Sequence, residues 1–144
     1  MEKDLAGQKR HIISEAGSRR KPDPRRSLGQ AAEAAAAEWL GRRGYEILER
    51  NYRCRAGEID IIARHDGELV FIEARSRSNL EFGLPEESVG RAKRRKLRQV
   101  AAWYLKERGQ SDAFCRFDVI GILRVPAEKG ADESWRFQLY QNAF

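Results

Sequence analysis

Two acidic residues, Asp60 and Glu73, are the side chains of this 144-residue chain whose type and spacing best fit a chemical role. They lie in two runs of β-branched and aromatic residues, 57–64 and 69–75, on either side of the dipeptide Asp66-Gly67. An Asp-Gly dipeptide between such runs predicts a β-hairpin. A turn centred there makes the numbers of facing residues sum to 133, so the sequence predicts that Asp60 faces Glu73.

The same register divides the predicted hairpin into two faces, because residues two apart in a strand share a side. It places Glu58 opposite Arg75 and Ile62 opposite Phe71 on the side of the acids. The other side is expected to be purely apolar and buried, with Ile59, Ile61, Ala63, Val70, Ile72 and Ala74. One face should therefore build core while the other gathers ionisable groups.

Two carboxylates that face each other across a hairpin repel, since their Cβ atoms are about 4.5–5.5 Å apart. They need either a shared proton or a cation between them. Mg²⁺ accepts one or two carboxylates together with waters and phosphate oxygens, which fits such a pair. The residue types leave one alternative open, a solvated network of Glu58, Asp60, Glu73 and Arg75 without any chemistry.

These motifs resemble those of a known family. Similar segments follow one another along the chain: 29–33, Ala36, 39–40, 44–45, 57–60, 71–77, 82–83, Val89, Lys93, 116–119 and 142–144. Together they resemble the YraN family of small bacterial proteins, which belongs to the restriction-endonuclease-like PD-(D/E)xK superfamily. The resemblance covers residues 29–144 and implies a metal-dependent nuclease fold.

By that resemblance, Asp60 and Glu73 are expected to be ligands of Mg²⁺ or Mn²⁺, and Glu33 an additional acid from the first helix. The superfamily places a lysine two residues after the second acid, and here Arg75 stands at that position. A lysine can lose its proton when buried, whereas arginine stays charged. Arg75 is thus expected to stabilise negative charge on a phosphate, and any step that needs a deprotonated amine there is excluded.

The composition bounds the class of protein. A length of 144 residues with 41% apolar content suits one domain, and the net charge of +6 favours a polyanionic partner. No apolar run is long enough to cross a membrane, and the amino terminus lacks the pattern of an export signal. Cys54 and Cys115 stand alone, as in reduced thiols. We therefore expect a cytoplasmic protein without a membrane partner, whose oligomeric state the sequence leaves open.

The elements that must position the acids follow an α/β order. Residues 1–26 are expected to form a disordered basic tail, and residues 27–144 a single restriction-endonuclease-like domain. A capping box at Ser27 predicts a helix up to Gly44, and Glu86 and Glu87 are expected to open a second helix that ends at Gly109. Strands are predicted at 45–52, 113–125 and 135–140. With the hairpin they give a mixed sheet of about five strands flanked by helices.

A dense group of cations lies in the first half of the second predicted helix. Together with Arg77, these residues are expected to bind nucleic-acid phosphates; the candidates are Arg77, Arg91, Lys93, Arg94 and Lys96. Carboxylates that can hold a metal, beside cations that can hold phosphates, predict a divalent-metal-dependent nuclease. Its expected partner is nucleic acid, and we expect DNA rather than RNA. Two alternatives remain open: a non-catalytic nucleic-acid-binding module of the same fold, and an adaptor for acidic protein partners.

Overall fold

The computed structural model describes residues 24–77, 89–125 and 134–144. The expected tail at 1–26 falls almost wholly outside this part of the chain, so it stays a prediction. The elements in order are helix α2 (Pro24–Arg42), strands β2 (Glu46–Cys54), β3 (Gly57–His65) and β4 (Glu68–Arg77), helix α4 (Arg91–Glu107), and strands β5 (Cys115–Val125) and β6 (Ser134–Tyr140). The predicted fold class is confirmed, because the domain is α/β with a five-stranded sheet.

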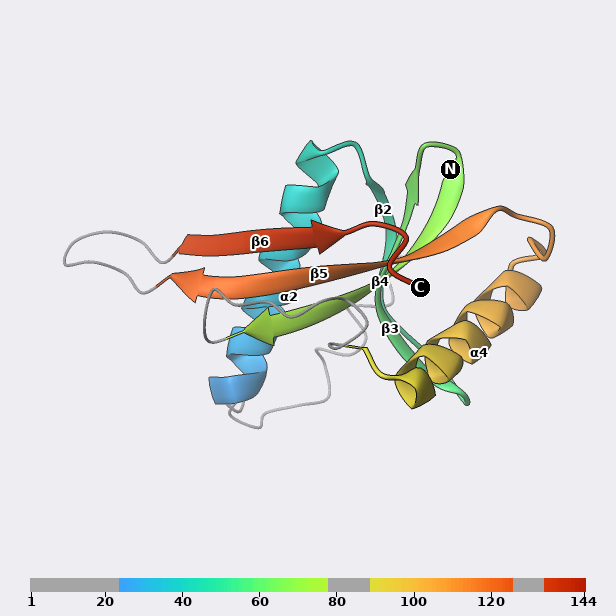
Figure 1. Cartoon of the computed structure of the whole chain (residues 1–144), viewed down its shortest axis with the longest axis horizontal. Helices are drawn as coiled ribbons and strands as arrows, with labels where there is room; N and C mark the ends of the chain where they lie inside the picture. The colour runs from blue at the N-terminus through green and yellow to red at the C-terminus, as the bar shows by residue number, and fades with distance from the viewer. Residues whose placement is uncertain (1–23, 78–88, 126–133) are drawn as a thin grey trace, which may run out of the picture.

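The sheet has the order β2-β3-β4-β5-β6 (Figure 1). Strand β5 runs parallel to β4, and every other neighbouring pair is antiparallel. The parallel pair follows from α4, since a helix between two strands carries the chain back to the edge from which the first strand started. The mixed sheet is therefore as the sequence predicts.

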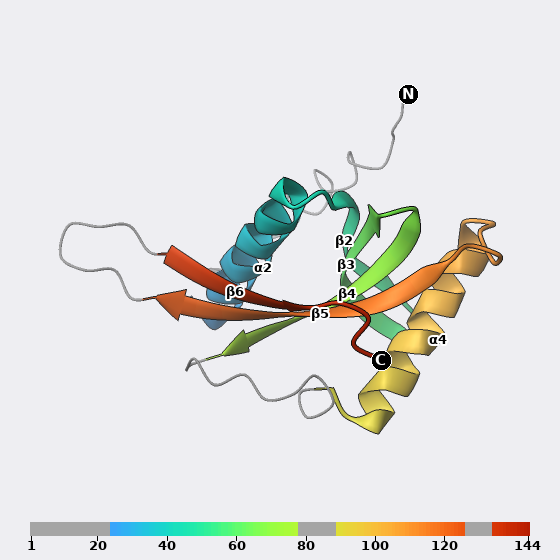
Figure 2. The same cartoon turned by 45° about the horizontal axis from the view of Figure 1, so that its top comes forward.

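The two helices cover opposite faces of the sheet (Figure 2). On one face α2 buries Ala32, Ala36 and Leu40 against Ile61, Val70, Ile72 and Ile120. On the other, α4 buries Leu97, Val100 and Tyr104 against Ile62, Phe71 and Val119. Even-numbered and odd-numbered residues of β4 thus pack into different cores. The prediction of one core face and one ionisable face is wrong for this half of the hairpin, because Ile62 and Phe71 are buried under α4.

The register of the hairpin is confirmed from Ile61↔Ile72 to His65↔Glu68, where facing numbers sum to 133. Beyond Ile61 the ladder between β3 and β4 stops. The predicted pairing of Glu58 with Arg75 is not formed; Glu58 instead lies opposite Arg53 of β2 and makes an ion pair with it at 3.1 Å. One end of β3 therefore separates from β4, and Asp60 lies where the two strands part.

A backbone irregularity in β2 accompanies this separation. Asn51 has φ of +54°, a left-handed conformation that asparagine adopts more readily than most residues. Its flanking residues Arg50 and Tyr52 face Ile61 and Ile59 of β3. Although a regular strand would put Ile59 and Ile61 on one side, Ile59 belongs to the α4 core and Ile61 to the α2 core. The predicted placement of Ile59 with Ile61 is wrong because the alternation is broken here.

Both helices begin at residues other than those predicted. Helix α2 starts at Pro24, which puts Ser27 inside it, and proline is favoured in the first turn because its missing N–H needs no partner there. Helix α4 starts at Arg91 after Gly90, so Glu86 and Glu87 do not open it and lie outside the described residues. Its predicted end is confirmed, with Gly109 at φ of +65°.

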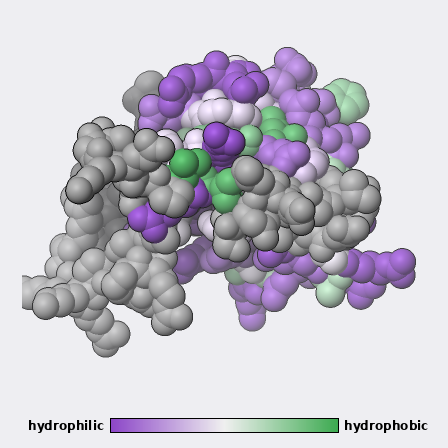
Figure 3. Space-filling view, turned by 60° about the vertical axis from the view of Figure 1, so that its left-hand side comes forward, coloured by the Kyte–Doolittle hydropathy of each residue, from purple (hydrophilic) through white to green (hydrophobic). Residues whose placement is uncertain are grey.

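On the face seen in Figure 3, the described residues are mainly hydrophilic, with a few apolar side chains between polar ones. Among the exposed large apolar residues are Trp103 and Phe114. Neither described helix combines the length and the apolar character that crossing a membrane requires.

Candidate metal and phosphate site

The ladder between β3 and β4 ends one pair before the predicted facing of Asp60 and Glu73, but their side chains still interact. Asp60 of β3 and Glu73 of β4 are hydrogen-bonding neighbours, and the carboxyl of Glu73 is almost fully buried with 8% of its side chain exposed. Burial raises the pKa of Glu73 to about 7, and the hydrogen bond and negative charge of Asp60 act in the same direction. The site therefore holds negative charge that its buried surroundings do not fully compensate.

The end of the hairpin ladder orients Asp60. Because β3 leaves β4 after Ile61, the backbone N–H of Ala74 donates to Asp60 Oδ2 at 2.9 Å instead of to a strand carbonyl. This hydrogen bond holds the carboxylate beside Glu73, the residue before Ala74. The break in strand pairing thus allows the side chain of Asp60 to lie at the site.

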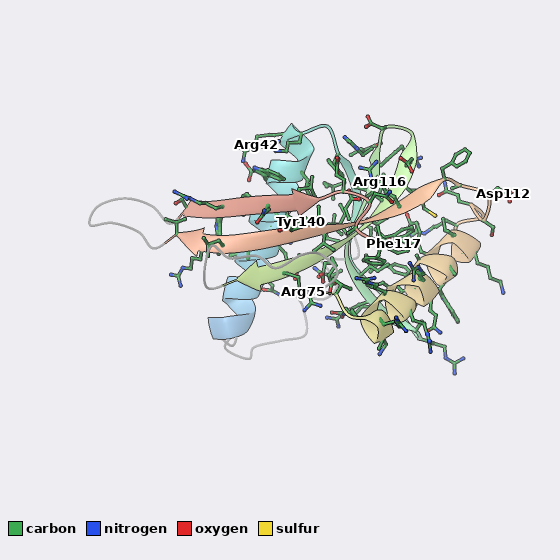
Figure 4. The ribbon with its side chains drawn as sticks, viewed as in Figure 1. Arg42, Arg75, Asp112, Arg116, Phe117 and Tyr140 are labelled. Carbon is green, nitrogen blue, oxygen red and sulfur yellow. The ribbon has the colours of Figure 1, made fainter. Side chains whose placement is uncertain are left out.

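Two cations from different elements meet the same carboxylate oxygen. Glu73 Oε2 lies 3.5 Å from Arg75 Nε and 3.4 Å from Lys93 Nζ of α4. Both positive charges oppose the rise in the pKa of Glu73. Arg75 Nε is buried without a hydrogen-bond partner among the described residues, so its contact with Glu73 is electrostatic. Figure 4 labels Arg75 on β4.

Glu33 of α2 lies close enough to the pair to interact with it. Partial burial raises its pKa, the charge of Asp60 raises it further, and Arg50 of β2 acts in the opposite direction. The structure therefore brings Glu33 of α2 within electrostatic range of Asp60, and its role as an additional acid of the site stays a prediction. It does not bring Glu33 into a common coordination set, since the described residues contain no group of three or more His, Cys, Asp or Glu that could hold a metal ion.

The other predicted phosphate-binding residues have different surroundings. Arg91 and Lys96 are exposed on α4. Arg94 is engaged within the protein, because its Nε donates to the carbonyl of Val89 at 2.8 Å and its guanidinium lies 5.5 Å from the centre of the Phe144 ring. The side chain of Arg77 lies outside the described part of the chain. Of the five candidates, Lys93 is the one with a described contact to the acid pair.

A second polar cluster lies around the fully buried Asp118 of β5, which faces Ile72, the residue before Glu73. Its carboxylate accepts hydrogen bonds from the Tyr45 hydroxyl at 2.9 Å, from Arg116 Nε at 3.1 Å and from the backbone N–H of Asn142 at 2.8 Å. A terminal nitrogen of Arg116 also lies 2.7 Å from His65 Nδ1. Arg116 and Phe117 mark this part of β5 in Figure 4. The cluster links β3 and β5 to Tyr45, which precedes β2, and to Asn142, which follows β6.

Sequence reasoning missed two features of these clusters. It placed Lys93 among the phosphate-binding cations but not beside Glu73, and no local pattern reports a contact across twenty residues. It also left Asp118 without a role. A signal for the second cluster was present, since Arg116 and Asp118 are two apart in an otherwise apolar strand and must share a face. A buried charge in such a strand needs a partner of opposite sign.

The class of protein follows from the fold and the acid pair. A mixed five-stranded sheet between two helices, with two acids where an inner hairpin parts, defines a restriction-endonuclease-like domain. The chain belongs to the family described as "Uncharacterised protein family UPF0102", whose model matches residues 32–122. The resemblance to the YraN family is thereby confirmed. The matched segment includes Glu33, Asp60, Glu73 and Lys93.

Close relatives carry the same family description. The chain is 56% identical to a UPF0102 protein of Moorella thermoacetica over 98 residues, which are 68% of this chain and 82% of the relative. It is 45% identical to one of Symbiobacterium thermophilum over 119 residues, which are 83% of this chain and 97% of the relative. A UPF0102 protein of Caldicellulosiruptor saccharolyticus is 41% identical over 120 residues, with coverage of 83% and 98%.

Proposed function

We propose that this protein is a divalent-metal-dependent nuclease that hydrolyses phosphodiester bonds in DNA. The observation that carries the proposal is the meeting of Asp60 and Glu73 beside Arg75 and Lys93. A carboxylate pair with cations at its edge fits phosphodiester chemistry, because one part can hold a metal and the other a phosphate. The net charge of +6 supports a polyanionic substrate.

The residues present fit a hard divalent ion. Mg²⁺ and Mn²⁺ accept one or two carboxylates and fill their other positions with waters and substrate oxygens, so two acids are sufficient. Burial raises the pKa of Glu73, and the adjacent carboxyl of Asp60 raises it further, so a bound cation would be favoured by both acids. Asp60 and Glu73 would hold the ion. When bound, it would polarise the scissile phosphate and lower the pKa of the attacking water.

The remaining residues act on the substrate and on the acids. Ala74 N–H fixes Asp60, and the low exposure of Glu73 keeps bulk water from its carboxylate. Arg75, always charged, would balance the negative charge that develops on the phosphate. Glu33 influences Asp60 through its charge and would order the water around the ion. Hydrolysis adds a water oxygen to phosphorus while the bond to the leaving sugar oxygen breaks; one water proton is lost to solvent, and the leaving oxygen gains one.

The test combines metal binding with cleavage, both on the full chain. Mg²⁺ and Mn²⁺ are titrated calorimetrically into wild type and Asp60→Asn, and both proteins are then given flapped, branched and single-stranded DNA with matched RNA. We expect the wild type to bind metal and cut DNA, and Asp60→Asn to lose both. Glu38→Gln is the matched control, since Glu38 is an exposed acid of α2 paired with Arg42.

Other results would favour the alternatives. Salt-dependent DNA binding without cleavage, by wild type and by Arg75→Lys alike, would contradict the nuclease and indicate a non-catalytic nucleic-acid-binding module. Absence of salt-dependent binding to both DNA and RNA would point to the adaptor. Cleavage by Asp60→Asn at the wild-type rate would remove the acid pair from the mechanism.

A further inference from the structure

We propose that Lys93 is a further catalytic residue of this site, and that its ammonium group contacts the scissile phosphate beside Asp60 and Glu73. It would supply from α4 the amine that the superfamily pattern places at position 75, where this chain has arginine. The inference rests on the proposed nuclease function and specifies it further: Lys93 acts on the reacting phosphate rather than on the flanking nucleic-acid backbone.

The first support is position. Lys93 Nζ lies 3.4 Å from Glu73 Oε2, although the two residues are 20 apart along the chain. The Lys93 side chain is 41% exposed, whereas that of Glu73 is 8% exposed. The amine therefore lies at the boundary between the buried carboxylate and solvent. A phosphate that reaches the acids from solvent must pass this boundary.

The second support is the difference between the two cations at Glu73. Arg75 Nε is buried and makes no hydrogen bond among the described residues, although it is 3.5 Å from Glu73 Oε2. The five N–H donors of arginine have a rigid planar arrangement, so Nε cannot be re-aimed without moving the whole group. The lysine ammonium is a compact charge with three rotatable donors. Lys93 can thus keep one donor on Glu73 and direct another to a phosphate oxygen.

The third support is the rigid attachment of Lys93. It is in the first turn of α4, and the two residues before the helix, Val89 and Gly90, are held by burial and by hydrogen bonds. Val89 is fully buried, its carbonyl accepts from Arg94 Nε at 2.8 Å, and Arg94 N–H donates to the carbonyl of Gly90 at 3.0 Å. A catalytic group on an anchored helix is held within the narrow range of positions that transition-state stabilisation needs.

The experiment measures steady-state cleavage by full-length protein, with flapped DNA at saturating Mg²⁺. Lys93→Gln removes the ammonium, and Lys106→Gln removes one from the last turn of the same helix as the matched control. We expect Lys93→Gln to lower kcat by about 100-fold, the usual effect of losing one donor to the developing charge, with KM changed by less than about threefold. Lys106→Gln should keep the wild-type kcat.

A rescue variant separates chemistry from folding. Arg75→Lys combined with Lys93→Gln returns an amine to the acid pair from β4, and we expect it to regain at least about tenfold in kcat. If Lys93→Gln does not fold, as judged by its unfolding transition, Lys93→Arg is measured instead. That variant keeps the charge but not the compact amine, and a kcat lowered at least about tenfold is expected.

The outcomes distinguish this inference from the proposed function. A raised KM with unchanged kcat would make Lys93 an ordinary backbone contact and overturn the inference alone, as would a loss of Mg²⁺ affinity without any rescue by Arg75→Lys. An active wild type with an equally active Lys93→Gln would do the same. Absence of cleavage by the wild type would overturn the proposed function and the role of Lys93 together.

Discussion

At the scale of single residues, the candidate site contains a carboxyl that is costly to ionise. Glu73 is buried, and its hydrogen-bonding neighbour is another acid. The two nearby cations, Arg75 and Lys93, reduce this cost without removing it. Such a pair is more stable with a proton or a metal ion between its oxygens, which couples the stability of the site to pH and to metal concentration.

The raised pKa of Glu73 predicts how stability depends on pH without metal. Because the folded-state pKa, about 7, is above the ordinary 4.5, the folded protein binds more protons between these values. The stabilising contribution of protonated Glu73 to the free energy of unfolding is fully present below about pH 4.5 and is lost as the pH rises through 7. We expect wild type to lose on the order of 2 kcal/mol relative to Glu73→Gln between pH 5 and 8, by urea unfolding in EDTA. A difference that stays constant with pH would contradict the burial of this charge.

At the scale of elements, the site exists because two strands deviate from regular geometry. The left-handed Asn51 in β2 lies beside the point where β3 leaves β4, and this separation frees Asp60 to accept the Ala74 N–H. In a continuous ladder the backbone N–H and C=O groups of the two strands would have bonded to one another. The irregularity is thus part of the site, although Asn51 itself carries no chemistry.

Substitution of Asn51 tests this relation. Asn51→Val puts a β-branched residue at φ of +54°, which should cost about 1–2 kcal/mol in unfolding free energy and weaken Mg²⁺ binding by displacing Asp60. Asn51→Gly accepts the same φ and is expected to keep both properties near wild type. Chemical denaturation and calorimetry measure the two effects. Equal behaviour of the valine and glycine variants would show that the left-handed conformation is not required.

At the scale of the whole molecule, the fold separates a structural polar cluster from the candidate site. The cluster at Asp118 joins β3 and β5 to Tyr45, which precedes β2, and to Asn142, which follows β6. Glu73 lies in the middle of β4, where it faces Val119, the residue after Asp118; strand alternation puts it on the face of the sheet opposite Asp118. The two clusters should therefore respond differently to mutation.

Removal of the Asp118 carboxylate should lower the stability of the whole fold. Asp118→Ala leaves the guanidinium of Arg116, with 10% of its side chain exposed, without its buried carboxylate. Breaking such a pair typically costs about 3–5 kcal/mol, so we expect a loss of that size in urea unfolding. Glu38→Ala breaks the exposed pair with Arg42 and should change stability by less than about 1 kcal/mol. Similar losses for both variants would mean that Asp118 is not a structural centre.

The excess of positive charge predicts salt-dependent binding. If α4 contacts phosphates, the affinity for DNA should fall as salt increases, and Lys96→Gln should reduce the slope of log K against log salt concentration by about 1. Lys106→Gln, at the other end of the helix, should leave the slope unchanged. Fluorescence anisotropy over a salt series measures both. A slope reduced by Lys106→Gln and unchanged by Lys96→Gln would mean that the phosphates bind elsewhere.

Much of this fold could be predicted because its signals are local. The Asp66-Gly67 turn and the alternating residues around it determine the hairpin register, and the apolar run at 113–125 after a helix predicts a parallel strand. Helix starts were harder to predict. Ser27 has the form of a cap yet lies inside α2, because capping is worth only about 1 kcal/mol and the packing of a longer helix can outweigh it.

The sequence by itself determined the fold class, the hairpin and the presence of one acid on each of its strands, since these follow from the order of residues over short distances. Only the tertiary structure decided that β3 parts from β4 at Asp60, that Lys93 reaches Glu73, and that Asp118 is buried with Arg116. The physical reason is that strand alternation assumes an unbroken strand, while contacts between distant residues depend on how helices pack on the finished sheet.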